Sequence, residues 1–154
     1  MRRASFIATV LVAIMSYSEK SFGQANWELG LRISDNVSAE ATIPIAAAPR
    51  WHPAVYFDRF GLASYFDWMF AISGGPRGLK FYPGVGPEIY FGDDVDFDIA
   101  GNFGAEYSFD FPLTVALDWR PSFRATEGFD FQAGNLGVSA RFRFGEGVRF
   151  RRVN

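Results

Sequence analysis

The chain has 154 residues and no cysteine, with 49% hydrophobic, 18% aromatic and 21% charged residues and a formal net charge of -2. The absence of thiols excludes disulfides, Cys-based zinc sites and iron–sulfur clusters. The chain also lacks the basic excess typical of nucleic-acid binding, so we expect no nucleic-acid partner. Eighteen Phe and sixteen Gly exceed what the core of a small soluble domain needs, and they favour a single all-β domain.

Residues 1–25 have the pattern of a cleavable signal peptide. Arg2 and Arg3 form a positive start, and an apolar stretch of ten residues and a small-residue cleavage site follow before Asn26. The apolar stretch is too short for a membrane-spanning helix, which needs about 20 residues. We therefore expect export of the mature chain to the envelope of a bacterium.

From residue 27 onward, apolar and polar residues alternate in segments that Gly, Pro, Asp, Asn and Ser separate. This period of two is the pattern of β-strands. No charged residue falls on the apolar register of the expected strands, whereas fifteen fall on the opposite register. The expected strands are residues 27–34, 38–45, 51–58, 62–72, 79–91, 96–109, 113–124 and 135–144.

Two architectures explain such a pattern, and they differ in which face lies inside. In a soluble barrel or sandwich the apolar face is the core, whereas in an outer-membrane barrel it contacts lipid and the charged face fills the lumen. Arg outnumbers Lys thirteen to two, which favours buried bidentate ion pairs. A charge-free face also suits a bilayer, because a charge at mid-membrane costs about 2–4 kcal/mol.

The sequence therefore predicts an all-β fold: an eight-stranded antiparallel up-and-down transmembrane β-barrel over residues 26–144, followed by a short basic tail over residues 145–154. If Asn26 lies on the periplasmic side, the periplasmic turns are residues 46–50, 73–78 and 110–112. The outer loops are then residues 35–37, 59–61, 92–95 and 125–134.

Two sets of side chains follow from this barrel. Inward charged residues are expected to form a salt-bridge network that fills a narrow lumen, with pairing of Glu28 with Arg32, Asp118 with Arg120, and Glu106 with Arg141. The expected network comprises Glu28, Arg32, Glu40, Asp67, Lys80, Glu88, Glu106, Asp118, Arg120, Arg141 and Arg143. Outward aromatic residues are expected to form two interfacial girdles. One comprises Trp27, Trp51, Phe70, Phe81, Tyr107, Phe109 and Phe144, and the other Phe57, Phe91, Phe97 and Phe123.

The run from Glu106 to Phe123 resembles the penultimate hairpin of small, mostly uncharacterised eight-stranded outer-membrane barrel proteins of Gram-negative bacteria, of the OmpX and OmpW type. Residues 82–86 and 135–144 are similar to that class too. The resemblance implies a fold and a location, not a defined activity. It also implies that Phe142 and Phe144 form the signal read by the barrel-assembly machinery. Outer-membrane lipids and lipopolysaccharide are the other expected partners.

Few residues indicate chemistry. His52 is the only histidine, and a lipid-modifying enzyme would combine it with a serine and a carboxylate, but no serine stands out as its partner. Asp94, Asp96 and Asp98 have the opening spacing of a calcium loop, yet Ile99 stands where Gly is required. We therefore expect no enzymatic activity, no metal and no cofactor.

Three functions stay open on the sequence. The first is an integral outer-membrane barrel with a structural or interaction role, or a narrow pore. The second is a soluble periplasmic β-barrel that binds a small apolar ligand. The third is an outer-membrane lipid-modifying enzyme.

Overall fold

The computed structural model describes residues 27–126, 128 and 130–144. The expected signal peptide and the expected basic tail lie outside these residues. The described chain forms strands connected by turns, without a helix. The strands are β1 (Trp27–Ile33), β2 (Ser38–Pro44), β3 (Pro49–Tyr56), β4 (Gly61–Trp68), β5 (Phe70–Ala71), β6 (Leu79–Tyr90), β7 (Asp96–Ser108), β8 (Leu113–Trp119), β9 (Ser122–Arg124), β10 (Asp130–Gln132) and β11 (Leu136–Phe144).

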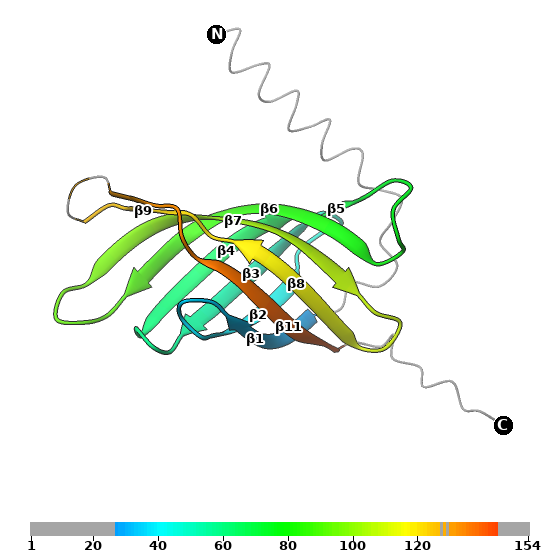
Figure 1. Ribbon diagram of the computed structural model, residues 1–154, viewed down its shortest axis with the longest axis horizontal. Helices are drawn as coiled ribbons and strands as arrows, with labels where there is room; N and C mark the ends of the chain where they lie inside the picture. Colours follow the sequence, from blue (N-terminus) through cyan, green and yellow to red (C-terminus); the bar gives the residue numbers. More distant parts are fainter. Residues whose placement is uncertain (1–26, 127, 129, 145–154) are drawn as a thin grey trace, which may run out of the picture.

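Eight of these strands form a closed antiparallel barrel (Figure 1). Each pairs with the next one along the chain, and β11 pairs with β1, so that the sheet closes on itself. The barrel strands are β1, β2, β3, β4, β6, β7, β8 and β11. The predicted eight-stranded up-and-down β-barrel is confirmed.

The structure differs from the predicted strands in four main places. The strand expected over residues 62–72 is interrupted at Met69, and the one expected over 113–124 is interrupted at Arg120 and Pro121. β5 continues β4 and pairs with β6 in the same register as β4 does. β9 likewise continues β8 and pairs with β7 in the same register. β10 lies in a segment expected to be a loop and pairs with β9. Three residues are too few for a period of two to be recognised.

The fourth difference is the start of β3, which was expected at Trp51 and lies at Pro49. Arg50 therefore belongs to the strand and not to the preceding turn. It shares a face with His52, because side chains two apart in a strand point the same way.

The pairing registers set the width of the barrel. We start at Phe144 and move from each residue to the residue paired with it on the neighbouring strand. After one circuit of the barrel this path returns to Gly134, ten residues before Phe144 in the chain. The path runs through Trp27, Ile43, Trp51, Phe66, Val85, Gly101 and Pro121. With a rise of about 3.3 Å per residue and a strand spacing of about 4.8 Å, this offset gives a strand tilt of about 40° and a radius of about 8 Å. Side chains from facing strands therefore meet inside the barrel.

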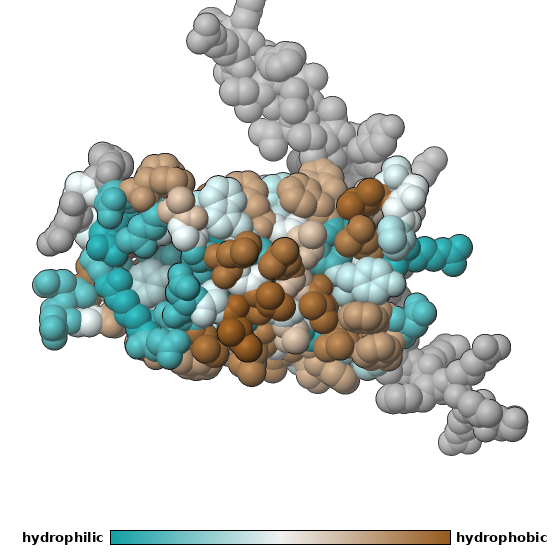
Figure 2. Space-filling model, in the orientation of Figure 1, coloured by the Kyte–Doolittle hydropathy of each residue, from teal (hydrophilic) through white to brown (hydrophobic). Residues whose placement is uncertain are grey.

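Polar residues fill the interior, and apolar residues cover the outside. Among the described residues, eighteen buried ones are polar or charged, whereas the nine buried hydrophobic ones are alanines, tyrosines and one methionine. Leu31, Ile33 and Leu136 are 55%, 66% and 63% exposed. Figure 2 shows the apolar side chains as a band around the middle of the barrel, with hydrophilic side chains gathered toward the end where β9 lies. This distribution is the reverse of a soluble protein with an aliphatic core.

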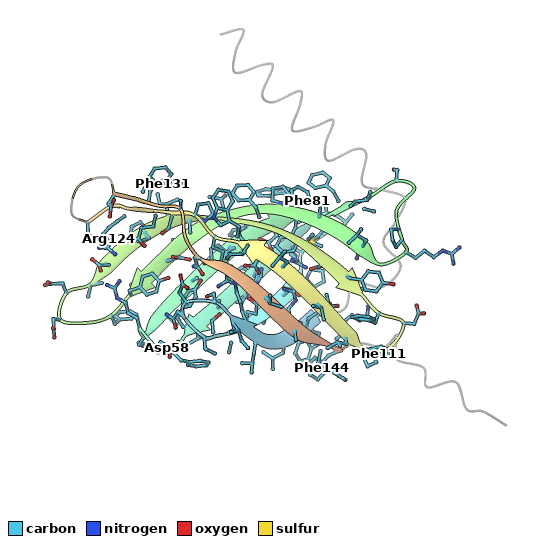
Figure 3. All side chains as sticks on the ribbon, viewed as in Figure 1. Asp58, Phe81, Phe111, Arg124, Phe131 and Phe144 are labelled. Carbon is cyan, nitrogen blue, oxygen red and sulfur yellow. The ribbon has the colours of Figure 1, made fainter. Side chains whose placement is uncertain are left out.

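The eleven aromatic residues expected in the two girdles lie on the outer face. Eight are exposed, and Phe70, Phe109 and Phe144 are half-buried. Trp27 stacks on Phe144 with ring centroids 4.3 Å apart, so β1 and β11 are also joined by aromatic contact at the closure of the barrel. Figure 3 shows Phe81, Phe131 and Phe144 on the outside of the ribbon.

We expect Gly30→Val to destabilise the closure between β1 and β11. A Cβ at Gly30 would overlap the backbone carbonyl of Ala140 on β11, and backbone has little freedom to move away. The free energy of unfolding should fall by about 1–3 kcal/mol, as for other overpacked positions. Urea unfolding of the refolded barrel measures this change. Gly92→Val is the control, because its nearest neighbour would be 3.6 Å away; an equal loss in both variants would contradict the prediction.

Candidate functional site

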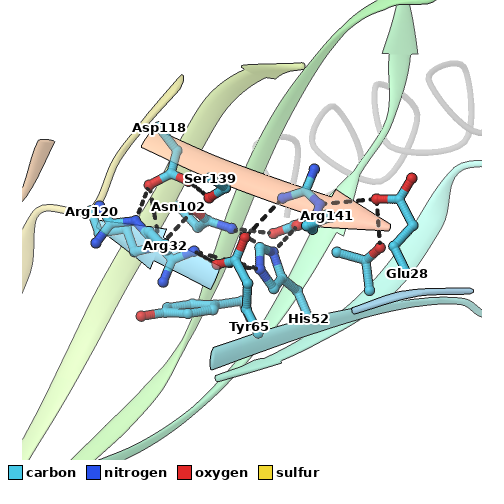
Figure 4. Close-up of polar contacts among 12 residues, drawn as sticks. Glu28, Arg32, His52, Tyr65, Asn102, Asp118, Arg120, Ser139 and Arg141 are labelled. Atoms are coloured by element: carbon cyan, nitrogen blue, oxygen red, sulfur yellow. Dashed lines mark hydrogen bonds and ion pairs between the residues drawn. The ribbon is translucent and has the colours of Figure 1, made fainter. Parts of the chain in front are cut away.

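Inward side chains of the barrel strands meet in one buried network of ion pairs and hydrogen bonds (Figure 4). We call this set the lumen network. Its charged members are five carboxylates, four guanidinium groups and the imidazole of His52. They are Glu28, Glu40, Asp67, Glu106 and Asp118, together with Arg32, Arg50, Arg120 and Arg141. Because side chains alternate along these strands, every second residue points into the lumen, and the charged ones meet there.

Arg141 on β11 binds three carboxylates at once. Its Nε donates to Oε2 of Glu28 at 2.9 Å, and its Nη1 to Oε1 of Glu40 at 3.0 Å. Its Nη2 donates to Oε2 of Glu106 at 2.5 Å. The three carboxylates come from β1, β2 and β7, so one planar guanidinium connects both sides of the lumen.

Arg120, which directly follows β8, forms a second centre. Its Nη2 donates to Oε2 of Glu40 at 2.8 Å, and its Nε to Oδ1 of Asn102 at 3.2 Å. Its Nη1 donates to the hydroxyl of Tyr56 at 3.2 Å. The guanidinium also lies 4.8 Å from the ring centroid of Tyr65, a cation–π contact that is stronger when water is excluded. Arg120 and Arg141 thus share Glu40.

His52 is held between two carboxylates. Its Nε2 lies 3.1 Å from Oε2 of Glu40, and its Nδ1 lies 2.8 Å from Oδ2 of Asp67. Asp67 also accepts from Nε of Arg50 at 3.0 Å and from Nδ2 of Asn102 at 2.8 Å. Both ring nitrogens are therefore occupied, and the carboxylates around them already have cationic or amide partners. This geometry fits a structural role for the imidazole.

Nine of the eleven charged residues predicted for the lumen are buried inside the barrel, and two are not. Lys80 is half-buried and lies opposite Glu106 across β6 and β7, but it forms no ion pair with a described residue. Arg143 is half-buried, and its Nη2 donates to the backbone carbonyls of Phe109 and Phe111. It therefore stabilises the turn between β7 and β8.

One predicted ion pair is wrong. Glu28 and Arg32 lie four residues apart on the same strand, which separates their Cα atoms by about 13 Å. Arg32 instead pairs with Asp118 at 2.6 Å, and Glu28 pairs with Arg141. The other two expected pairs are formed: Asp118 with Arg120 at 3.4 Å, and Glu106 with Arg141.

Several members of the lumen network were not predicted from the sequence. Arg50 binds both Asp67 and Glu106, but the predicted turn over residues 46–50 removed it from the inward register. Arg50 lies two residues before His52, and this spacing places both side chains on the same face of a strand, so it could have identified Arg50 as inward. Asn102 and Tyr82 fall on the predicted inward register, but the predicted network contained charged residues alone and so did not include them. Tyr82 lies under Arg50, with the guanidinium 4.4 Å from its ring centroid.

Glu88 is buried but forms no ion pair with another described residue. Its carboxylate accepts hydrogen bonds from the hydroxyls of Tyr65, Tyr56 and Tyr90. Three phenol donors replace a cationic partner, so the described part of the lumen combines ion pairs with a polar aromatic cluster at the end nearer Tyr90.

No protein-family model and no curated protein matches the chain. Residues 27–126, 128 and 130–144 contain no helix long and apolar enough to cross a membrane. Within the same residues, no group of three or more His, Cys, Asp or Glu side chains is placed to hold a metal ion. Function must therefore be inferred from the lumen network and the surfaces around it.

We expect Arg141→Ala to lower the free energy of unfolding by about 3–5 kcal/mol, because it leaves buried carboxylates without their cation. Urea unfolding of the refolded barrel, followed by Trp fluorescence, measures the loss. Arg143→Ala on the same strand is the matched control, because Arg143 contacts only turn carbonyls among the described residues. Similar midpoints for both variants would show that the lumen network does not stabilise the barrel.

Proposed function

We propose that this protein is an integral outer-membrane β-barrel with a structural or interaction role, in which the lumen network closes the interior. The observation that carries the proposal is the reversed distribution of side chains: charged residues are buried inside, and large apolar residues are exposed around the outside. In water this arrangement exposes a continuous apolar band, which soluble monomers avoid. In a bilayer the same band is the surface that contacts lipid.

Closure of the barrel supports the same proposal. Lipid offers no hydrogen-bonding partners, so a sheet that crosses a bilayer needs every strand edge paired. The pairing of β11 with β1 over seven residue pairs removes the last free edge of the barrel. Aromatic residues toward both ends of the outer face match the position of interfacial girdles.

The interior argues against the two other candidate functions. A barrel that stores a small apolar ligand needs an apolar cavity, but the buried residues described here are mostly charged or polar. A lipid-modifying enzyme needs a nucleophile beside a base, but both ring nitrogens of His52 face Glu40 and Asp67. We therefore favour a closed barrel without catalytic activity.

We expect Val85→Arg to destabilise the protein in lipid bilayers by about 2–4 kcal/mol, the cost of an arginine on the lipid face near the midplane. Val85 lies in the middle of β6, between the girdle residues Phe81 and Phe91, and is 48% exposed. Unfolding in phospholipid vesicles measures this cost. Val95→Arg is the control, because Val95 is 58% exposed but lies in the turn between β6 and β7.

The same pair of variants separates a membrane barrel from a soluble one. An exposed position of a soluble barrel tolerates arginine, so unchanged stability of both variants and recovery of the wild type without detergent would reject the proposal. Recovery of the wild type in the outer-membrane fraction, with heat-modifiable migration on gels, is the expected result.

We expect the wild-type barrel to show no steady ion conductance in planar bilayers, because the lumen network fills the interior. Replacing both Arg120 and Arg141 by Ala removes the two guanidinium groups that meet at Glu40 and should increase conductance. Arg143→Ala should behave as the wild type. A steady conductance of the wild type would show that the lumen is an open pore.

A further inference from the structure

His52 is the only histidine of the chain, and it is fully buried inside the lumen network (Figure 4). Its Nε2 lies 3.1 Å from Oε2 of Glu40, and its Nδ1 lies 2.8 Å from Oδ2 of Asp67. Both separations are those of hydrogen bonds. A neutral imidazole has one N–H donor and one bare nitrogen that accepts, whereas a charged imidazolium donates from both nitrogens.

The two carboxylates beside the ring require donors. Oε2 of Glu40 also accepts from Arg120, and Oε1 accepts from Arg141. Oδ2 of Asp67 accepts from Arg50. Carboxylates held by guanidinium groups are ionised, and an ionised carboxylate only accepts hydrogen bonds. Each ring nitrogen that faces one of these oxygens must therefore carry a proton.

The charge of the lumen network leads to the same protonation state. Among the described residues, its five carboxylates face four guanidinium groups, so a neutral His52 would leave one buried negative charge unbalanced. A doubly protonated His52 makes five cations for five anions. Glu88 and Lys80 lie outside the network on the same strand, β6, and their opposite charges leave this balance unchanged.

The other groups around the ring are weaker partners than the two carboxylates. Nδ2 of Asn102 on β7 lies 3.2 Å from Nδ1, and Nη2 of Arg120 lies 3.5 Å from Nε2. The phenol of Tyr65 on β4 meets the imidazole edge-on, with ring centroids 5.8 Å apart. Burial and the charge of Arg120 disfavour an imidazolium, whereas carboxylates in contact with it favour it. Carboxylate oxygens are the closer contacts at both nitrogens.

Solvent can approach this site from one end of the barrel. A recess of about 280 Å³ opens there, and Arg120 is part of its lining together with Glu88 and Tyr90. The same Arg120 contacts both Glu40 and the imidazole. One side chain therefore separates the recess from the ring of His52, so the pH of the medium can act on this buried group.

We propose that His52 is doubly protonated at neutral pH and serves as the fifth cation of the lumen network, which makes this network a pH-dependent lock on the barrel interior. The charged ring joins β2 to β4 through its two hydrogen bonds. Loss of one proton turns one of these contacts into acceptor against acceptor and leaves a buried negative charge unbalanced. The lock rests on the closed interior proposed above, but not on the membrane location.

The charge of the ring is tested by ¹⁵N NMR on the full chain, labelled with ¹⁵N-histidine, purified without a histidine tag and refolded in detergent. One histidine gives one pair of ring signals. A free histidine is mostly neutral at about pH 7.5, whereas both ring nitrogens of His52 should be protonated at this pH. A bare Nε2 or a bare Nδ1 would overturn the proposal.

Asp67→Asn tests the charge balance, because it removes one anion and keeps the shape of the side chain. Four carboxylates then face four guanidinium groups, so the ring should be neutral at the same pH, with its proton on the Nε2 that faces Glu40. Asp110→Asn is the matched control, because Asp110 is exposed in the turn between β7 and β8. The ring should stay doubly protonated in this control, and an imidazolium that persists in Asp67→Asn would contradict the proposal.

The stability of the wild type should fall as the pH rises. The unfolded chain loses its histidine proton near pH 6.5 and the folded chain keeps it, so the unfolding equilibrium constant should rise by up to tenfold per pH unit above about pH 6.5. Urea unfolding in detergent between about pH 6 and 8.5 measures this slope. His52→Gln has no imidazole to titrate and should show a much smaller slope.

Equal slopes in the wild type and His52→Gln would overturn the proposal. Heat-modifiable migration establishes that His52→Gln is folded, and the ring signals of the wild type decide by themselves if it is not. All these measurements are made in detergent, so recovery of the protein outside the outer membrane would reject the proposed function without changing them.

Discussion

The structure depends on the mutual neutralisation of charged side chains inside a narrow barrel. An offset of ten residues over eight strands gives a radius of about 8 Å, so inward side chains contact each other across the lumen. A buried charge without a partner lowers the free energy of unfolding. A guanidinium that binds several carboxylates has hydrogen-bond acceptors for most of its N–H groups. Arg141, with three carboxylates from three strands, shows how the wall is held together from within.

The outer face and the inner face therefore have separate roles. Outside, exposed apolar residues and aromatic residues suit contact with lipid. Inside, the lumen network occupies the middle of the barrel, and the tyrosine cluster around Glu88 adjoins it through the hydrogen bond from Arg120 to Tyr56. A closed interior and an open recess at one end are compatible because Arg120, which lines the recess, belongs to the network that closes the interior.

The alternation of residues was enough to predict the eight barrel strands, because a strand exposes one face to lipid or solvent and one to the interior over its whole length. It failed where this pattern was short or interrupted. β10 has three residues, and the break at Pro121 follows from the missing N–H of proline. Arg50 was assigned to a turn although its spacing from His52 placed it inward, and that single boundary error concealed a buried residue that binds both Asp67 and Glu106.

The sequence by itself determined the number of strands and which side chains point inward, because both follow from a local period of two. The tertiary structure decided which charged groups meet. Glu28 and Arg32 are close in sequence but too far apart along one strand, whereas Glu28 meets Arg141 across the closure of the barrel. The ion pair between Asp98 and Arg124 likewise forms only once β9 pairs with β7. Strand tilt and register decide which charged side chains meet across the lumen. Both are set only when the sheet closes, so a local sequence pattern does not predict the ion pairs.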